Sequence, residues 1–145
     1  MDAYPHHYKV QAAAKAEGDV TLASERLPGL LSAPPLQFGG PGDQWSPETL
    51  LVASSADCLI LTFRAIARAS KLPWLSLDCD AEGVLDRVDG VTRFTEMRMN
   101  ARLVLPAGGD VERARRLLEK AEKTCLITCS LKAEPVLQSD VTIAG

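Results

Sequence analysis

One long helix constrains the fold more than any other segment. Ser46 can cap its free N–H groups, Pro47 suits the first helical position, and Glu48 lies at the positive end of the helix dipole. The helix is predicted to run to Ser70, because residues 71–73 (KLP) stop it. Its apolar residues occupy nearly every face rather than one stripe: Leu50, Leu51, Val52, Ala53, Ala56, Cys58, Leu59, Ile60, Leu61, Phe63, Ala65 and Ile66. This pattern predicts a central helix that other elements cover.

Three short strands are predicted before this helix. Residues 8–14 and 19–24 flank Glu17-Gly18, which suits a hairpin turn, and Gly29–Ser32 forms the third strand. The loop of residues 34–47, rich in glycine and proline, is typical of a turn region inside one domain rather than of a linker.

Two long strands are predicted after the helix, joined at Asp89-Gly90, a favoured hairpin dipeptide. In both strands apolar residues alternate with polar ones, so one face of the hairpin packs on a core. The apolar positions are Leu75, Leu77, Cys79, Ala81, Met97, Met99, Ala101, Leu103 and Leu105.

A second helix is capped by Asp110 and ends in residues 123–130 (KTCLITCS), and a last strand contains Pro135, which marks an edge strand or its start. The order β-β-β-α-β-β-α-β predicts an α+β fold with antiparallel strands, because hairpins dominate over crossovers. A length of 145 residues fits one domain over residues 1–145.

Composition excludes several classes of function. The net charge is −3 and no basic cluster is present, so nucleic-acid binding has no support. No uninterrupted run approaches 18 apolar residues, so no membrane span is expected. The first ten residues lack a basic region followed by an apolar one, which argues for the cytoplasm.

Four cysteines are the candidates for chemistry. Cys58 and Cys79 lie on apolar faces, where a cysteine often serves as a small core residue. Cys125 and Cys129 have the spacing C-x-x-x-C, and a metal held by this pair is one reading. The two histidines are adjacent near the N-terminus, so no second ligand pair is evident and no metal or cofactor is expected.

A thiol peroxidase needs a reactive thiolate, a second thiol that converts the sulfenic acid to a disulfide, and an apolar pocket for an organic substrate. Burial of Cys58 would raise its pKa, so a cation is needed to lower it, normally an arginine fixed by a carboxylate. Glu48 can be that carboxylate, about three turns before Cys58 and about 15 Å away along the axis. A bridge between the two therefore needs a group between them.

The residue motifs of the sequence are more informative than the spacing between Glu48 and Cys58 alone. Residues 38–69 resemble the central helix of the OsmC/Ohr family, with a Gly-rich loop, the motif [SN]-P-E-x-L-L and small residues ending in the reactive cysteine. Residues 125–128 (CLIT) look like the C-P-[VI]-S of that family, and residues 130–133 match the entry to the final strand. The resemblance, closest to the OsmC-like branch, covers nearly the whole chain.

The resemblance implies that Cys58 is the peroxidatic cysteine, Cys125 the resolving cysteine and Glu48 the carboxylate that orients a catalytic arginine. It implies an intertwined homodimer with active sites at the interface, organic hydroperoxides as substrates, and a dithiol reductant such as a lipoyl protein or thioredoxin. We also expect the sulfurs of Cys58 and Cys125 to approach within reach of a disulfide.

Three departures accompany the resemblance. Leu126 replaces the proline of the family motif, so the turn is set less rigidly, and Cys129 is an additional thiol. No motif fixes the catalytic arginine. Arg26 is the only arginine before Cys58, and Lys15 is another cation of that segment. Two further arginines, Arg64 and Arg68, follow Cys58 and are expected to reach solvent or a partner chain.

A second reading is therefore a non-catalytic or weakly active dimer of the same fold that binds a small apolar ligand. The unplaced arginine favours this reading, and the two cysteines at family positions favour the peroxidase.

Overall fold

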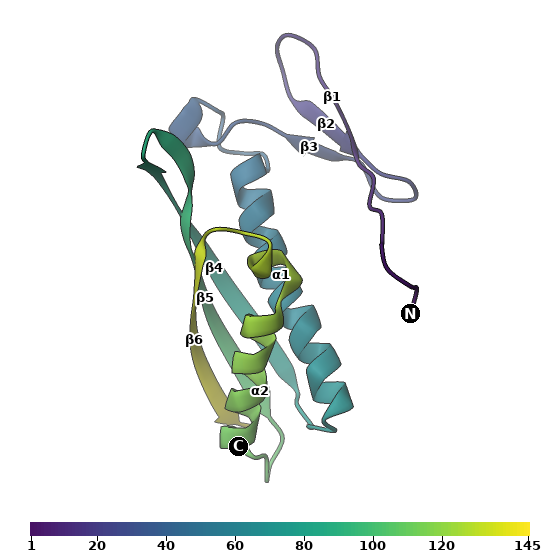
Figure 1. Ribbon diagram of the computed structural model, residues 1–145, viewed down its shortest axis with the longest axis vertical. Helices are drawn as coiled ribbons and strands as arrows, with labels where there is room; N and C mark the ends of the chain where they lie inside the picture. Colours follow the sequence, from purple (N-terminus) through teal and green to yellow (C-terminus); the bar gives the residue numbers. More distant parts are fainter. The chain divides into compact units, whose positions relative to one another are not determined.

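The computed structural model describes all residues from Met1 to Gly145, shown in Figure 1. The chain forms two compact units, Met1–Leu50 and Leu51–Gly145, which are described one after the other. A single domain over the whole chain stays a prediction.

The first unit contains a three-stranded antiparallel sheet. Its strands are β1 (Gln11–Ala13), β2 (Val20–Ala23) and β3 (Leu30–Ser32), in the order β1-β2-β3. Gly18 has a φ of 96° in the first turn, a left-handed conformation that glycine adopts without strain. The three predicted strands are therefore confirmed, although each is shorter than expected. A single turn of 3-10 helix, η1 (Leu36–Phe38), lies in the loop that follows.

The long helix α1 covers Pro47–Ala69, as the capping residues predict. The Ser46 Oγ accepts a hydrogen bond from the Thr49 N–H at 3.1 Å, and the Thr49 Oγ1 accepts one from the Ser46 N–H at 2.9 Å. This reciprocal pair satisfies two backbone donors at the start of the helix. At the other end the chain turns at Lys71, whose φ is 56°.

Helix α1 is long and apolar enough, by length and composition, to cross a membrane. The expectation of no such segment rested on uninterrupted apolar runs, which Ser54, Ser55 and Asp57 break. In the second unit α1 buries one stripe at helical spacing, and its other positions are partly or fully exposed, so the predicted covering of nearly every face is not seen within one chain. The stripe consists of Ser55, Leu59, Phe63 and Ala67.

The second unit is built on the strands β4 (Ser76–Val88), β5 (Val91–Leu105) and β6 (Glu134–Ile143), in the order β4-β5-β6. Strands β4 and β5 form the predicted antiparallel hairpin around Asp89-Gly90. Strand β6 pairs with β5 in parallel, which corrects the expectation of antiparallel strands throughout. The reason is the helix between β5 and β6, which carries the chain back along the sheet as a crossover.

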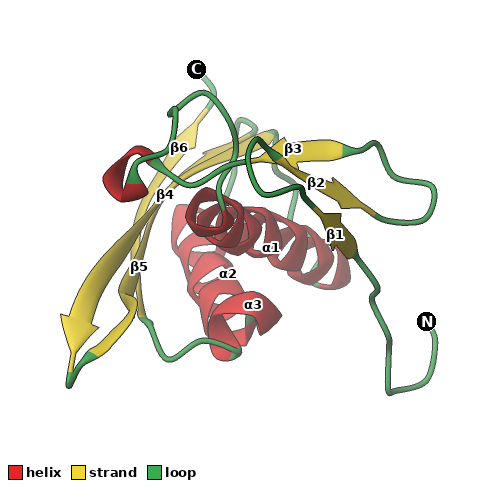
Figure 2. Cartoon of the chain, turned by 90° about the horizontal axis from the view of Figure 1, so that it is seen from above, coloured by secondary structure: helices red, strands yellow, loops and turns green.

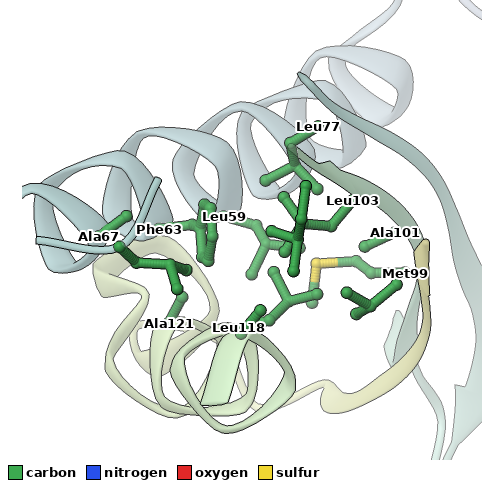
Figure 3. Close-up of a cluster of buried hydrophobic side chains, with 13 residues drawn as sticks. Leu59, Phe63, Ala67, Leu77, Met99, Ala101, Leu103, Leu118 and Ala121 are labelled. Carbon is green, nitrogen blue, oxygen red and sulfur yellow. The ribbon is translucent and has the colours of Figure 1, made fainter. Parts of the chain in front are cut away.

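Helices α1 and α2 (Val111–Thr124) lie on one face of this sheet (Figure 2). Asp110 caps α2 as predicted, because its carboxylate accepts a hydrogen bond from the Arg113 N–H at 3.0 Å. Figure 3 shows the core between the helices and the sheet. Its fully buried side chains include Leu59, Phe63, Leu103 and Leu118.

Two contacts fix α1 in the second unit. At Gly83 of β4, an added Cβ would lie 2.7 Å from Val52 Cγ2 and 2.7 Å from Phe94 Cε1, so only glycine fits without displacing a neighbour. At the end of α1, the Arg113 guanidinium donates a hydrogen bond to the Ser70 carbonyl. The sheet and α2 therefore hold opposite ends of the same helix.

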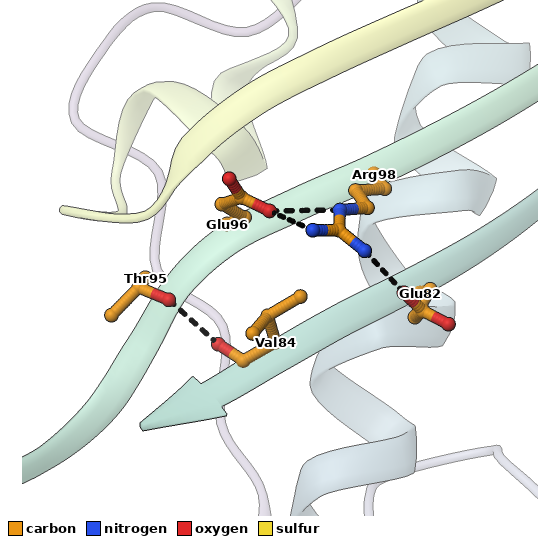
Figure 4. A network of polar contacts seen from close by, with 5 residues as sticks. All are labelled: Glu82, Val84, Thr95, Glu96 and Arg98. Atoms are coloured by element: carbon orange, nitrogen blue, oxygen red, sulfur yellow. Dashed lines mark hydrogen bonds and ion pairs between the residues drawn. The ribbon is translucent and has the colours of Figure 1, made fainter. Parts of the chain in front are cut away.

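The other face of the sheet is polar (Figure 4). Arg98 pairs with Glu82 at 3.0 Å and with Glu96 at 2.7 Å, and all three side chains are solvent-accessible. Such exposed pairs contribute little to stability, on the order of 1 kcal/mol or less each. The alternation predicted from the sequence thus separates a core face from a solvated face.

Candidate active site

Cys58 lies in the middle of α1 and is partly exposed. Its sulfur is 3.7 Å from the hydroxyl oxygen of Thr62, one helical turn later. Positions i and i+4 share a helix face, so this neighbour follows from the helix itself. Thr62 was absent from the residues that the sequence singled out, although its spacing from Cys58 was a signal.

Cys125 lies between α2 and the short helix α3 (Leu126–Cys129) and is completely buried. Its carbonyl accepts hydrogen bonds from the Cys129 N–H at 3.0 Å and the Thr128 hydroxyl at 3.2 Å. These bonds hold the α3 turn closed over Cys125. The second helix therefore ends within residues 123–130, as predicted, and a short helical turn follows it.

The structure places Cys58 and Cys125 close enough that each thiol shifts the pKa of the other. Burial alone would raise the pKa of Cys58. Hydrogen bonds from the Cys125 thiol, the Ile127 N–H, the Thr62 hydroxyl and the Leu126 N–H outweigh that effect and lower the pKa of Cys58 below its ordinary value. The two thiols are neighbours that shift each other's pKa, and their approach within reach of a disulfide stays a prediction.

The opposite shift applies to Cys125. Burial raises its pKa, and the hydrogen bond to Cys58 and the charge of the Cys58 thiolate raise it further, against the opposing effect of the Thr128 N–H and hydroxyl. When one of the two thiols ionises, the pair therefore favours the thiolate at Cys58 and the thiol at Cys125. Two neighbouring thiols are thereby given different protonation states, which is the asymmetry that a nucleophile and its partner need.

Leu126 acts in a way that sequence reasoning missed. The loss of the family proline was interpreted as a less rigid turn, yet a residue other than proline has an N–H, and the N–H of Leu126 contributes to lowering the pKa of Cys58. Together with the Ile127 N–H it forms part of a backbone cradle for the thiolate. The departure from the motif was itself the signal, because proline could not supply this donor.

Glu48 and Arg26 belong to the first unit. Glu48 lies in the first turn of α1 and is partly exposed, and Arg26 lies in the turn between β2 and β3, exposed and with a φ of 65°. None of the ion pairs of the chain contains either residue. The structure thus brings the two cysteines together without pairing Glu48 to Arg26. Arg64 and Arg68 are exposed on α1.

The remaining cysteines differ from this pair. Burial raises the pKa of Cys79 to about 11, and the neighbouring Asp80 carboxylate adds to the increase. Cys129 is exposed, and its thiol donates to the Lys123 carbonyl at 3.3 Å. The chain contains no group of three or more histidine, cysteine or carboxylate side chains that could hold a metal ion.

Comparison with known proteins identifies the class of protein. The family model described as OsmC-like protein matches residues 40–140, a range that includes both cysteines of the candidate site. The chain belongs to the OsmC-like family. A curated relative, the uncharacterized protein YmaD of Bacillus subtilis, is 28% identical over 112 residues, which cover 75% of each chain.

Solved structures share the fold. An OsmC-like protein of unknown function from Vibrio cholerae superimposes with a TM-score of 0.85 at 18% identity, covering 94% of this chain and all of the other. An organic hydroperoxide resistance protein OsmC from Legionella pneumophila gives a TM-score of 0.74 at 20% identity, covering 99% of this chain and all of the other. The predicted α+β fold of the OsmC/Ohr type is therefore confirmed.

Proposed function

We propose that this protein is a thiol-dependent peroxidase that reduces organic hydroperoxides to alcohols. The observation that carries the proposal is the contact between Cys58, whose pKa is lowered, and the buried thiol of Cys125. Membership of the OsmC-like family supports a peroxide-related role. The organic hydroperoxide resistance proteins among the structural neighbours add to that support.

In the first step the Cys58 thiolate attacks the terminal oxygen of ROOH. The O–O bond breaks, the alkoxide takes up a proton and leaves as the alcohol, and Cys58 becomes a sulfenic acid. The backbone N–H groups of Leu126 and Ile127 and the Thr62 hydroxyl stabilise the attacking thiolate. They therefore raise the fraction of Cys58 that is reactive near neutral pH.

In the second step Cys125 attacks the Cys58 sulfenic acid, forming the Cys58–Cys125 disulfide and releasing water. Oxidation of Cys58 removes the negative charge and the accepted hydrogen bond that raise the pKa of Cys125. The Thr128 N–H and hydroxyl then favour the Cys125 thiolate with less opposition. The first reaction thus prepares the resolving thiol for the second.

Glu48 and Arg26 complete the proposed site. We assign to Glu48 the carboxylate that orients a guanidinium toward Cys58, and to Arg26 that guanidinium. Both side chains are accessible and no other ion pair occupies them. Arginine suits the role because its planar fork can contact a carboxylate with two N–H groups, which the ammonium of Lys15 cannot do.

A homodimer is the proposed assembly. Leu61 is 51% exposed on α1, although the helix is apolar on most faces. Within the first unit Val10, Leu27 and Leu31 are also exposed. We propose that these exposed apolar side chains are buried against a second copy of the chain. We place the protein in the cytoplasm, with a dithiol such as a lipoyl protein or thioredoxin as its reductant.

The test is rapid-mixing measurement of cumene hydroperoxide consumption with dithiothreitol as reductant. Wild type is expected to turn over, Cys58→Ser to lose activity, and Cys125→Ser to give one stoichiometric burst. A wild-type rate equal to that of free cysteine contradicts the peroxidase.

The second candidate, a dimer that binds a small apolar ligand without catalysis, is favoured by one observation: Arg26 and Glu48 form no ion pair within the chain. It is distinguished by the same experiment. A slow wild-type reaction, together with co-purification of an apolar molecule identified by mass spectrometry, supports this alternative.

A further inference from the structure

The proposed disulfide poses a problem of access. Cys125 is completely buried and Cys58 is only partly exposed, so a dithiol carried by another protein has little room to attack either sulfur. Cys129, in contrast, is exposed and lies at the end of the α3 turn that begins after Cys125. The chain therefore contains a third thiol on the surface, where an external dithiol can reach it.

The α3 turn sets the distance between Cys125 and Cys129. The hydrogen bond from the Cys129 N–H to the Cys125 carbonyl, 3.0 Å long, closes one helical turn. Four residues of helix rise about 6 Å, so the two Cα atoms lie within the range found across disulfides. The Cys129 thiol donates to the Lys123 carbonyl at 3.3 Å and so already points to the junction of α2 and α3.

We propose that Cys129 is the entry thiol of an internal relay that transfers the oxidised state from the buried pair to the surface. This inference rests on the proposed peroxidase function. The Cys129 thiolate attacks the Cys125 sulfur of the Cys58–Cys125 disulfide. The Cys125–Cys129 bond forms, the Cys58–Cys125 bond breaks, and Cys58 leaves as a thiolate. The proton of Cys129 is released to solvent.

An external dithiol completes the cycle. One of its thiolates attacks the exposed Cys129 sulfur, and Cys125 leaves and takes up a proton. The second thiolate of the dithiol then displaces Cys129 from the mixed disulfide. The dithiol becomes a disulfide, and two electrons restore Cys125 and Cys129 to thiols.

The hydrogen bonds of the site favour this direction of exchange. In thiol–disulfide exchange the sulfur with the lower pKa leaves faster. The N–H groups of Leu126 and Ile127 and the Thr62 hydroxyl lower the pKa of Cys58, so attack on Cys125 expels the better leaving group. Each relay step therefore regenerates Cys58 in the form that reacts with peroxide.

The first test separates peroxide reaction from re-reduction. Each variant is oxidised with one equivalent of cumene hydroperoxide, and recovery of free thiol is then followed with reduced thioredoxin and, separately, with dithiothreitol. We expect Cys129→Ser to recover at least tenfold more slowly than wild type with thioredoxin, and by a smaller factor with the small dithiol. Cys79→Ser is the matched control and should recover at the wild-type rate, because Cys79 lies on β4 outside the pair.

The second test does not depend on peroxide chemistry. Cys58→Ser is treated with diamide, which oxidises thiol pairs, and disulfide-linked peptides are mapped by mass spectrometry. The relay requires a Cys125–Cys129 disulfide in this variant, and its absence overturns the proposal. Recovery of Cys129→Ser at the wild-type rate with thioredoxin also overturns it. An absent peroxide burst in wild type counts against the peroxidase alone, since the diamide result still reports on the exchange.

Discussion

The thiols of Cys58 and Cys125, which are far apart in the chain, are neighbours in the structure, and each shifts the pKa of the other. The same contact lowers the pKa of Cys58 and raises that of Cys125. The roles of nucleophile and partner are therefore assigned by geometry, because a single hydrogen bond can satisfy only one thiolate at a time.

Replacing Leu126 with proline tests the backbone cradle. The Leu126→Pro variant should fold, because proline suits the first position of a helix and Cys125, with φ −58° and ψ 114°, has the extended backbone that precedes proline. It loses the N–H that donates to Cys58, so the pKa of Cys58 rises. A lost hydrogen bond of about 1 kcal/mol corresponds to a roughly fivefold slower peroxide reaction near neutral pH.

Leu126→Ala is the matched control for that variant. The leucine side chain is 66% exposed, so alanine removes little buried contact and keeps the N–H. Stopped-flow rates and ultraviolet titration of the thiolate should match wild type for alanine and differ for proline. Equal pKa values of Cys58 in the two variants would rule out the Leu126 N–H as a donor.

Thr62 provides a second test of thiolate stabilisation. Thr62→Val keeps the shape of the side chain but removes the hydroxyl that lies 3.7 Å from the Cys58 sulfur. The pKa of Cys58 should rise and the peroxide reaction should slow about two- to fivefold, as expected for a weak hydrogen bond. Thr62→Ser retains the hydroxyl and should stay near wild type. A valine variant as fast as the serine variant would show that the hydroxyl is not needed.

The pH dependence of alkylation should separate the cysteines. Cys58, with a lowered pKa, keeps its thiolate to lower pH and loses it only as the pH falls through that value. Cys79, with a pKa of about 11, stays protonated near neutral pH. Quantitative peptide mapping after brief iodoacetamide treatment should show Cys58 modified and Cys79 intact. Equal labelling near neutral pH would be inconsistent with the hydrogen bonds described for Cys58.

The proposed dimer predicts an effect of charge on α1. Leu61→Glu places a carboxylate on an apolar, exposed position of the helix and should convert a dimer to a monomer, because burying an unpaired charge is costly. Light scattering coupled to gel filtration measures the mass directly. Val91→Glu, at the exposed first position of β5, should leave the mass unchanged. A monomeric wild type would remove the homodimer from the proposal.

Truncation of Phe63 in the hydrophobic core is expected to lower the stability of the protein. This residue is completely buried and contacts Trp74 edge-on, with ring centroids 5.5 Å apart. Phe63→Ala should lower the free energy of unfolding by about 3–5 kcal/mol, as for other large-to-small core changes. Urea denaturation followed by circular dichroism gives the value, with Leu126→Ala as the exposed comparison. A loss below about 1 kcal/mol would show that the site collapses or that the helix packs elsewhere.

The local signals in the sequence predicted most of the elements. Ser46 and Pro47 fixed the start of α1, and Asp89-Gly90 fixed the hairpin, because capping and turn geometry depend on adjacent residues. The direction of β6 was missed, since parallel pairing depends on where the α2 crossover returns the chain, which no short motif encodes. Pro135 still marks its beginning at the sheet edge.

The candidate site was predictable in part for a similar reason. Cys58 and Cys125 were recognised from their motifs, and their contact needed the packing of α1 against α2 and α3. The N–H groups of Leu126 and Ile127 could not be predicted as donors, because every residue except proline has a backbone N–H. Only side chains could be singled out from the sequence, and these pointed to an activating cation. The roles of Glu48 and Arg26 stay predictions.

The crossover through α2 limits where the chain can change in length. Helix α2 delivers Cys125 to Cys58, and one inserted residue would turn everything after it by about 100° and shift it by about 1.5 Å. The hairpin loop at Asp89-Gly90 does not set the position of a site residue, because the strands on either side are aligned by their own pairing. Variation in length should therefore be tolerated at the hairpin and excluded from α2, which acts as a spacer of fixed size between sheet and thiol.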